Sequence, residues 1–191
     1  MQRLTQRLDP TASHEVFDAL MRTLAEPGRP RRIRTDLIEL PSPALLALAL
    51  CDVDVDFAVV GDDTAATEVA IALSEATRSD RVDLAVAGHV VHLAPPADLS
   101  GHRRGTALAP ELGARVAIPV GAIGSGPRYR LSGAGVPGVL ELSVDGVSPS
   151  LVTSLGRASG TFPTGLDTWL FADDGTVVAI SRSTTIQFVE D

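Results

Sequence analysis

The sequence predicts a mixed α/β protein, built as a three-layer α/β/α sandwich around a mixed sheet of about seven strands. Two observations lead to this prediction. Segments of strand and helix character alternate in the middle of the chain, and a strand–turn–strand pattern follows near its C-terminus. The 191 residues are 45% apolar, which is enough for one sizeable core. We therefore expect a single domain over residues 1–191, with residues 1–12 as a loose N-terminal leader.

The clearest strand pattern is a hairpin formed by residues 166–171 and 176–180. Its turn reads Asp-Asp-Gly, and Asp-Gly tolerates the positive φ values that tight turns need. An antiparallel hairpin brings its incoming and outgoing ends side by side. The residues that flank these ends form the candidate edge for a ligand or partner: Gly165, Asp167, Arg182 and Thr184.

Two interpretations of this edge are open. Arginine holds phosphate oxygens through paired hydrogen bonds, so Arg182 and Thr184 could bind an anion or another polar ligand. Alternatively, Arg182 packs against the hairpin and pairs with Asp167 across it. The sequence does not decide between them.

Four helices are expected from apolar residues at helical spacing. They run from Ser13 to Pro27-Gly28 and over residues 44–51, 63–76 and 149–157. A residue that can cap a helix precedes each one: Ser13, Ser42, Asp62 or Asp63, and Ser148.

The other strands are expected over residues 33–40, 55–60, 82–87, 114–120, 127–132 and 139–144, and the chain then ends with the segment 186–189 after the hairpin. Gly133, Gly135 and Gly138 spell the spacing of a dinucleotide-binding loop. That loop must open a helix, whereas here Pro137 lies inside the motif and a strand follows. We interpret these glycines as a turn or bulge.

Composition excludes several classes of function. The net charge of −8 disfavours binding to DNA or RNA, which requires clustered cations. The chain contains no lysine, so it can offer neither a lysine for a Schiff base nor the lysine of a P-loop. The single Cys51 is expected to be a core thiol. The polar N-terminus and the short apolar runs predict a cytoplasmic protein that does not enter a membrane.

The sequence indicates no metal, no cofactor and no assignable catalytic residue. Asp52, Asp54 and Asp56 lack the glycine and glutamate of a calcium loop and are expected to form an exposed acidic loop. His89 and His92 would point to opposite faces of a strand, which disfavours a shared metal. His14 and Asp18 lie one helical turn apart and are expected to be a local pair.

A cluster of arginines follows the first predicted helix. Arg29, Arg31, Arg32 and Arg34 occur within six residues. Such a run is typical of a solvated face, and the alternative is a contact with an anion or a partner.

The order of several motifs resembles a known family over nearly the whole chain. These motifs are Phe17-x-x-Leu20-Met21 with Leu24-Ala25-x-Pro27-Gly28, Ser42-Pro43-Ala44 with Leu48-x-Leu50-Cys51-Asp52, Gly105-Thr106-x-x-x-Pro110-Glu111, Ser132-Gly133-x-Gly135-Val136, Phe162-Pro163-x-Gly165-x-Asp167, and Arg182-Ser183-Thr184-x-Ile186. The family is PhnH, a core subunit of the carbon–phosphorus lyase system that breaks down phosphonates. Two features depart from the family pattern. Ser181 stands where a proline is usual, and the region 65–80 is shorter than in the family and lacks its usual aromatic and glycine features.

The resemblance implies a fold like the large domain of pyridoxal-phosphate transferases, but without that cofactor. It also implies a homodimer and membership of a complex with the PhnG, PhnI and PhnJ subunits. That complex forms α-D-ribose 1-methylphosphonate 5-triphosphate from ATP and methylphosphonate. The chain is then an accessory subunit of a transferase and lyase complex. The alternative is an autonomous phosphometabolite- or nucleotide-binding enzyme that uses the Arg182 edge.

Overall fold

The computed structural model describes residues 7–36, 38–159 and 161–189. Within them the helices are α1 (Pro10–Ala25), α2 (Ala44–Leu50), α3 (Asp63–Thr77) and α4 (Pro149–Ser159). The strands are β1 (Arg31–Arg32), β2 (Asp56–Val60), β3 (Asp80–Arg81), β4 (His89–His92), β5 (Arg104–Thr106), β6 (Ala109–Gly113), β7 (Arg115–Val120), β8 (Ala122–Gly133), β9 (Leu140–Asp145), β10 (Asp167–Ala172), β11 (Thr176–Ile180) and β12 (Thr184–Phe188).

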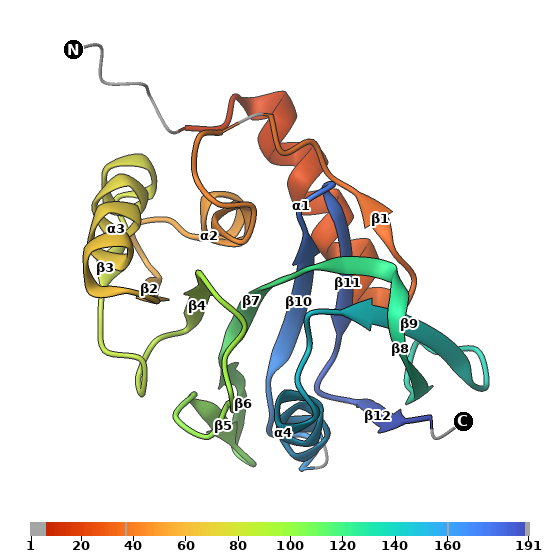
Figure 1. Ribbon diagram of the computed structural model, residues 1–191. Coiled ribbons are helices and arrows are strands. Elements are labelled where there is room, and N and C mark those ends of the chain that lie inside the picture. Colours follow the sequence, from red (N-terminus) through yellow and green to blue (C-terminus); the bar gives the residue numbers. More distant parts are fainter. Residues whose placement is uncertain (1–6, 37, 160, 190–191) are drawn as a thin grey trace.

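A seven-stranded sheet with the order β1-β11-β10-β7-β4-β2-β3 forms the centre of the molecule (Figure 1). The strands from β10 to β3 run parallel to one another, whereas β11 and β1 pair antiparallel. The expected mixed α/β class, with four helices in the described residues and a mixed sheet of seven strands, is therefore confirmed.

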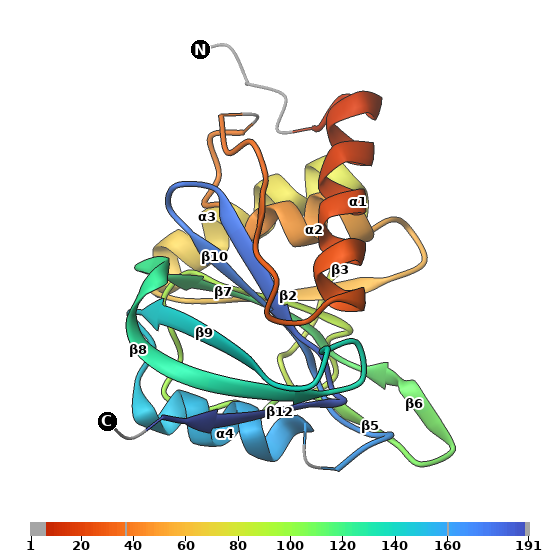
Figure 2. The same ribbon diagram turned by 90° about the vertical axis from the view of Figure 1, so that its right-hand side faces the viewer.

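Different elements cover the two faces of this sheet. Helices α1, α2 and α3 lie on one face, and a second sheet with the order β12-β8-β9 lies on the other together with α4 (Figure 2). The layer opposite α1–α3 thus contains a sheet as well as a helix, which the expected α/β/α arrangement did not include.

Side chains of the central strands alternate between these two layers, as the period of two in a strand requires. In β10, Trp169 and Phe171 pack with α1 and α2, whereas Leu170 and Ala172 pack with β8, β9 and α4. The indole Nε1 of Trp169 donates to Leu20 O at 3.1 Å. Because Trp169 is fully buried, this hydrogen bond fixes α1 on the sheet without leaving a polar group unpaired.

The predicted C-terminal hairpin is confirmed by β10 and β11. Thr168 pairs with Ile180 at its open end. At its tip, Gly175 adopts φ 84° and donates its N–H to Ala172 O at 3.0 Å. A residue with a side chain would be strained in that conformation, which is why the turn requires glycine.

Two of the expected helix caps are wrong. Helix α1 begins at Pro10, and Asp9 Oδ1 accepts hydrogen bonds from the N–H groups of Thr11 and Ala12. Proline suits the first helical position because its missing N–H would have no helical partner there. The helix thus starts before Ser13, and residues 10–12 are helical and not part of a loose leader. Residues 1–6 of that leader lie outside the described residues.

Helix α2 also lacks its expected cap. It begins at Ala44, and no capping side chain accepts a hydrogen bond from its first N–H groups, so the proposed role of Ser42 is wrong. The other two caps are confirmed. Asp62 Oδ1 accepts from Thr64 N at the start of α3, and Ser148 Oγ accepts from Leu151 N at the start of α4.

Two expected strands are absent from their predicted positions. The described part of residues 33–40 is irregular, and only Arg31–Arg32 pairs with β11. Residues 82–87 form a turn in which Asp83 O accepts from Val86 N and Ala87 N, and the strands β3 and β4 lie on either side of it. The apolar composition of the segment did not distinguish this turn from a strand.

The three spaced glycines make the turn between β8 and β9, as predicted. Gly133, Gly135 and Gly138 all have positive φ values, and no helix opens there. A Cβ at Gly135 would clash with Ala25 O at the end of α1. The interpretation as a turn is confirmed.

Candidate functional site

The two ends of the hairpin meet at a buried ion pair between Arg182 and Asp167. We call the four predicted residues around it the Arg182 edge: Gly165, Asp167, Arg182 and Thr184. Arg182 Nη2 lies 2.6 Å from Asp167 Oδ2, and Arg182 Nε lies 3.1 Å from the same oxygen. The backbone N–H of Arg182 donates to Asp167 Oδ1 at 3.0 Å. The two side chains are only 14% and 12% exposed. The interpretation that pairs Arg182 with Asp167 is confirmed.

The same arginine joins the hairpin to the small β5–β6 sheet. Arg182 Nη1 donates to Pro110 O, and Gly165 N donates to Arg104 O at 2.9 Å. A Cβ at Gly165 would clash with Ala158 O of α4, so glycine allows the chain to pass between β5 and α4. All three guanidinium nitrogens of Arg182 therefore donate within the chain.

Thr184 lies at this edge but faces inward. Its side chain is fully buried, and its Oγ1 accepts a hydrogen bond from Ser181 N at 3.2 Å. Proline, which the resembled family usually has in place of Ser181, has no N–H to donate. The structure thus brings the four predicted residues together as an internal junction, and a ligand at this edge stays a prediction.

A polar pocket of about 530 Å³ lies beside α4. This cavity, called the polar pocket below, is lined by Asp98, Ser100, Arg104, Ser150, Thr153, Ser154 and Arg157. Arg104 Nη1 donates to Arg157 O at 3.1 Å, which connects β5 to the last turn of α4. The buried Ser154 Oγ accepts from Leu99 N at 2.8 Å. These bonds hold the walls of the pocket together.

Sequence reasoning missed this pocket because its residues come from two separate segments, 98–104 and 150–157. One signal was present in α4. Ser150, Thr153, Ser154 and Arg157 follow the i, i+3, i+4, i+7 spacing that places them on one helical face. The opposite face is apolar and buried. Such a polar stripe shows that this side of α4 faces polar groups or solvent, and its member Ser154 is itself buried. The stripe does not show which segment lies across from it.

An apolar groove of about 500 Å³ lies on the other side of α4, against the edge strand β12. Val152 and Gly156 of α4 and Ile186 and Phe188 of β12 contribute to it. The side chain of Phe188 is 56% exposed. The groove borders the polar pocket, since Thr153 and Arg157 line both.

Two buried histidines form a direct pair that sequence reasoning also missed. His92 Nε2 lies 2.9 Å from His102 Nε2, so one ring must donate and the other accept. His102 Nδ1 is buried without a partner in the described part of the chain. Burial, together with the neighbouring His102, lowers the pKa of His92 to about 3. The pair is therefore neutral at physiological pH.

His89 and His92 contact different partners, as their expected opposite orientations imply. His89 Nδ1 lies 3.3 Å from Asp56 O, on the neighbouring strand. In residues 7–36, 38–159 and 161–189, no three His, Cys, Asp or Glu side chains are placed to hold a metal. Asp52 Oδ1 accepts from Asp54 N, which makes the expected acidic loop a local turn.

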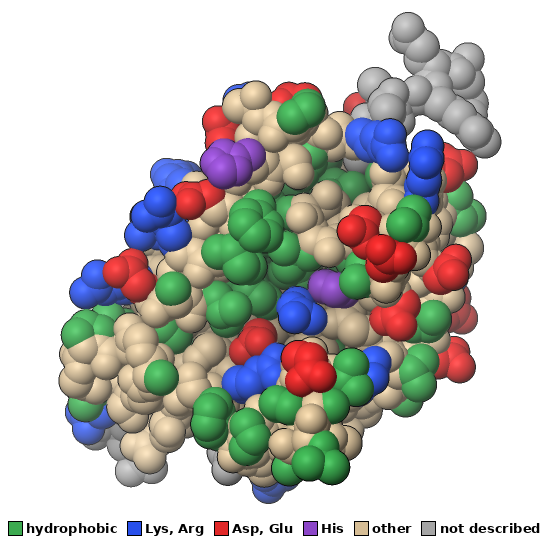
Figure 3. All heavy atoms as spheres, turned by 180° about the vertical axis from the view of Figure 1, so that it is seen from behind, with side chains coloured by type: hydrophobic (Ala, Val, Ile, Leu, Met, Phe, Trp, Pro, Cys, Tyr) green, Lys and Arg blue, Asp and Glu red, His purple; other side chains and the backbone are tan. Residues whose placement is uncertain are grey.

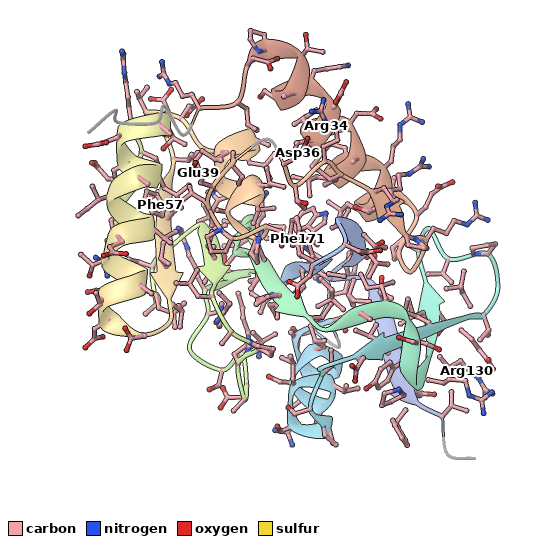
Figure 4. The ribbon with its side chains drawn as sticks, turned by 45° about the horizontal axis from the view of Figure 1, so that its top comes forward. Arg34, Asp36, Glu39, Phe57, Arg130 and Phe171 are labelled. Carbon is pink, nitrogen blue, oxygen red and sulfur yellow. The ribbon has the colours of Figure 1, made fainter. Side chains whose placement is uncertain are left out.

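The arginine cluster after α1 is exposed and paired with carboxylates. Arg34 Nη2 lies 3.2 Å from Asp36 Oδ2, and the two side chains lie side by side in Figure 4. On the face shown in Figure 3, basic side chains are scattered among acidic ones around a group of hydrophobic side chains. These observations favour the solvated face. The other ion pairs of the cluster are Arg29–Glu26, Arg31–Glu26 and Arg32–Asp174.

Two further sequence candidates have structural roles. Asp18 pairs with Arg22 at 2.6 Å and not with His14. Burial raises the pKa of the Cys51 thiol to about 12, so it is not a reactive thiolate. Among the described residues, no helix has the length and apolar composition needed to span a bilayer.

A family model described as "Bacterial phosphonate metabolism protein (PhnH)" matches residues 7–187. No curated protein matches the chain. The four helices, the Arg182 edge and the polar pocket all lie within the matched residues.

Proposed function

The chain belongs to the PhnH family of bacterial phosphonate metabolism proteins, and from this premise we propose that it is an accessory subunit of the carbon–phosphorus lyase core complex. The observation that supports the proposal is the family match, which spans residues 7–187 and hence nearly the whole chain. The motifs that carried the resemblance are distributed over the same length.

The proposed reaction of the complex is the formation of α-D-ribose 1-methylphosphonate 5-triphosphate from ATP and methylphosphonate. In this proposal the chain forms a homodimer when alone and assembles with PhnG, PhnI and PhnJ in the cytoplasm. Its part is to shape the assembly, and the radical cleavage of the carbon–phosphorus bond takes place on another subunit. Its single cysteine cannot by itself ligate an iron–sulfur cluster.

We further propose that residues 1–191 are one PhnH-like domain related to the large domain of pyridoxal-phosphate transferases. The central mixed sheet with helices beside it supports this relation. The absence of lysine from the sequence is the reason to expect no pyridoxal phosphate, which is anchored by a lysine Schiff base.

Gene deletion tests the proposed function. A strain without this gene should not grow on methylphosphonate as the only phosphorus source, while growth on phosphate continues. Co-expression with PhnG, PhnI and PhnJ, followed by size-exclusion chromatography, should yield one complex that contains all four chains. Undiminished growth on methylphosphonate would rule the proposal out.

We do not adopt the alternative of an autonomous phosphometabolite- or nucleotide-binding enzyme at the Arg182 edge. Arg182 Nε, Nη1 and Nη2 each already donate to a group within the chain. An anion bound there would have to break the pair with Asp167 and leave a nearly buried carboxylate without its partner, which is costly.

A further inference from the structure

We propose that the polar pocket binds a small phosphorus oxyanion, such as a phosphate group or a phosphonate, through the guanidinium groups of Arg104 and Arg157. The inference concerns a ligand site in the subunit itself and goes beyond its place in the complex. Oxyanion binding rests on the pocket alone, whereas the choice of a phosphonate as ligand rests on the proposed function.

Arg157 is the first reason for this assignment. Its guanidinium makes no hydrogen bond or ion pair with any residue in the described ranges, although its backbone carbonyl accepts from Arg104. Among the described residues, eight other arginines pair with a carboxylate: Arg22, Arg29, Arg31, Arg32, Arg34, Arg128, Arg130 and Arg182. An arginine that lines a pocket with its donors unused can hold two oxygens of a tetrahedral anion.

Arg104 is the second reason. It is half-buried and approaches the pocket from β5, opposite α4. Its Nη1 donates to Arg157 O at 3.1 Å, and the described residues offer no partner to its other guanidinium nitrogens. Two arginines from separate elements can therefore approach one ligand, which a single surface arginine cannot do.

The charge balance of the pocket favours an anion. Asp98 is the one acidic residue that lines it. Its Oδ1 accepts from Ser100 N at 2.8 Å and from Ser100 Oγ at 2.6 Å, and these bonds lower its pKa. Two arginines against one carboxylate leave a net positive charge in a protein whose overall charge is −8.

The pocket is built on rigid elements. Ser154, which is buried, binds Leu99 N and so fixes the segment that carries Asp98 and Ser100. Gly165 N binds Arg104 O, which couples β5 to the Arg182 edge. Because the backbone of both walls is held in place, the ordering cost of binding is confined to the side chains that meet the ligand.

Calorimetric titration of the purified full-length protein tests the proposal. The probes are inorganic phosphate and methylphosphonate, with sodium acetate at equal ionic strength as the control anion. We expect saturable heat with the two phosphorus oxyanions and none with acetate. Arg157→Gln should weaken binding at least tenfold, and Arg104→Gln should do the same.

Arg34→Gln is the matched control, since it also removes one exposed positive charge but lies in the loop after β1. It should change the affinity less than twofold. Absence of saturable binding to the wild-type protein, equal losses in Arg157→Gln and Arg34→Gln, or unchanged binding in Arg157→Gln would each overturn the proposal. Melting curves of the variants show whether they are folded.

Two comparisons distinguish the failure of this proposal from the failure of the proposed function, and an anion from a protein subunit as the occupant of the pocket. If deletion of the gene abolishes growth on methylphosphonate but the purified protein binds neither probe, the complex role stands and the pocket proposal fails. If Arg157→Gln releases the other subunits while neither probe binds the wild-type protein, the pocket is a protein contact and the proposal is likewise overturned. Tighter binding of methylphosphonate than of phosphate supports a phosphonate ligand.

Discussion

The Arg182 edge and the polar pocket contain the same chemical groups in opposite states. Each combines arginine with one aspartate, Asp167 in the edge and Asp98 in the pocket. In the edge the guanidinium faces the carboxylate directly and both side chains are nearly buried. In the pocket the carboxylate is bonded to Ser100, and Arg157 is left without a partner among the described residues. An arginine becomes available to a ligand only when the fold does not use its donors.

The largest effect that tests this comparison is expected from Arg182→Ala. Removing one partner of a buried ion pair leaves Asp167 charged and unpaired, and we expect a loss of about 3 kcal/mol in the free energy of unfolding. Urea unfolding followed by the fluorescence of the buried Trp169 measures it. Arg34→Ala, which breaks an exposed pair, should cost less than about 0.5 kcal/mol. Equal losses in the two variants would contradict the structural role of the Arg182 edge.

The buried histidine pair should produce the next largest effect, on acidification. His92 has a pKa of about 3 in the folded protein and about 6.5 when unfolded. Between these values the unfolded chain binds the additional proton, so stability falls as the pH drops below 6.5. From pH 7 to pH 5 this single group should lower the free energy of unfolding by about 2 kcal/mol. Burial lowers the pKa of His102 in the same direction.

Urea unfolding at pH 7 and at pH 5 checks this expectation. In His92→Gln, the difference between the two pH values should shrink by about 2 kcal/mol. His14→Gln serves as the control because His14 is exposed on α1. If both variants keep the full acid sensitivity of the wild type, the pair does not carry it.

The smallest effect on stability is expected from Arg157→Gln. Because its guanidinium has no partner in the described ranges, the substitution should change the free energy of unfolding by less than about 0.5 kcal/mol. Thermal melting without added anions measures the change. A loss close to that of Arg182→Ala would show that Arg157 is a structural arginine, and the contrast between the two regions would disappear.

Several elements were predictable because short-range chemistry determines them. The Asp-Asp-Gly turn between β10 and β11, the caps Asp62 and Ser148, and the turn at Gly133, Gly135 and Gly138 were all correctly predicted. The errors fell where short-range preferences compete. Ser13 is a good cap, but Asp9 before Pro10 is a better one. Residues 82–87 are mostly apolar, like a buried strand, yet hydrogen bonds to Asp83 O close them into a turn.

The candidate site was only half predictable. The hairpin rule correctly placed Gly165, Asp167, Arg182 and Thr184 together, because antiparallel pairing joins its two ends. The rule did not reveal that Thr184 faces inward or that Pro110 O accepts a hydrogen bond from Arg182 Nη1. The polar pocket needs the approach of β5 to α4, and His102 reaches His92 from a loop ten residues further on. No spacing along the chain encodes either contact.

By itself, the sequence determined the mixed α/β class, the family, and the exclusion of lysine chemistry. These follow from periodicity, motif order and composition, which are properties of the chain read in one dimension. Only the tertiary structure decided which arginines are used internally and which remain available. That outcome depends on distances of a few ångströms between segments more than fifty residues apart, such as Arg104 and Arg157.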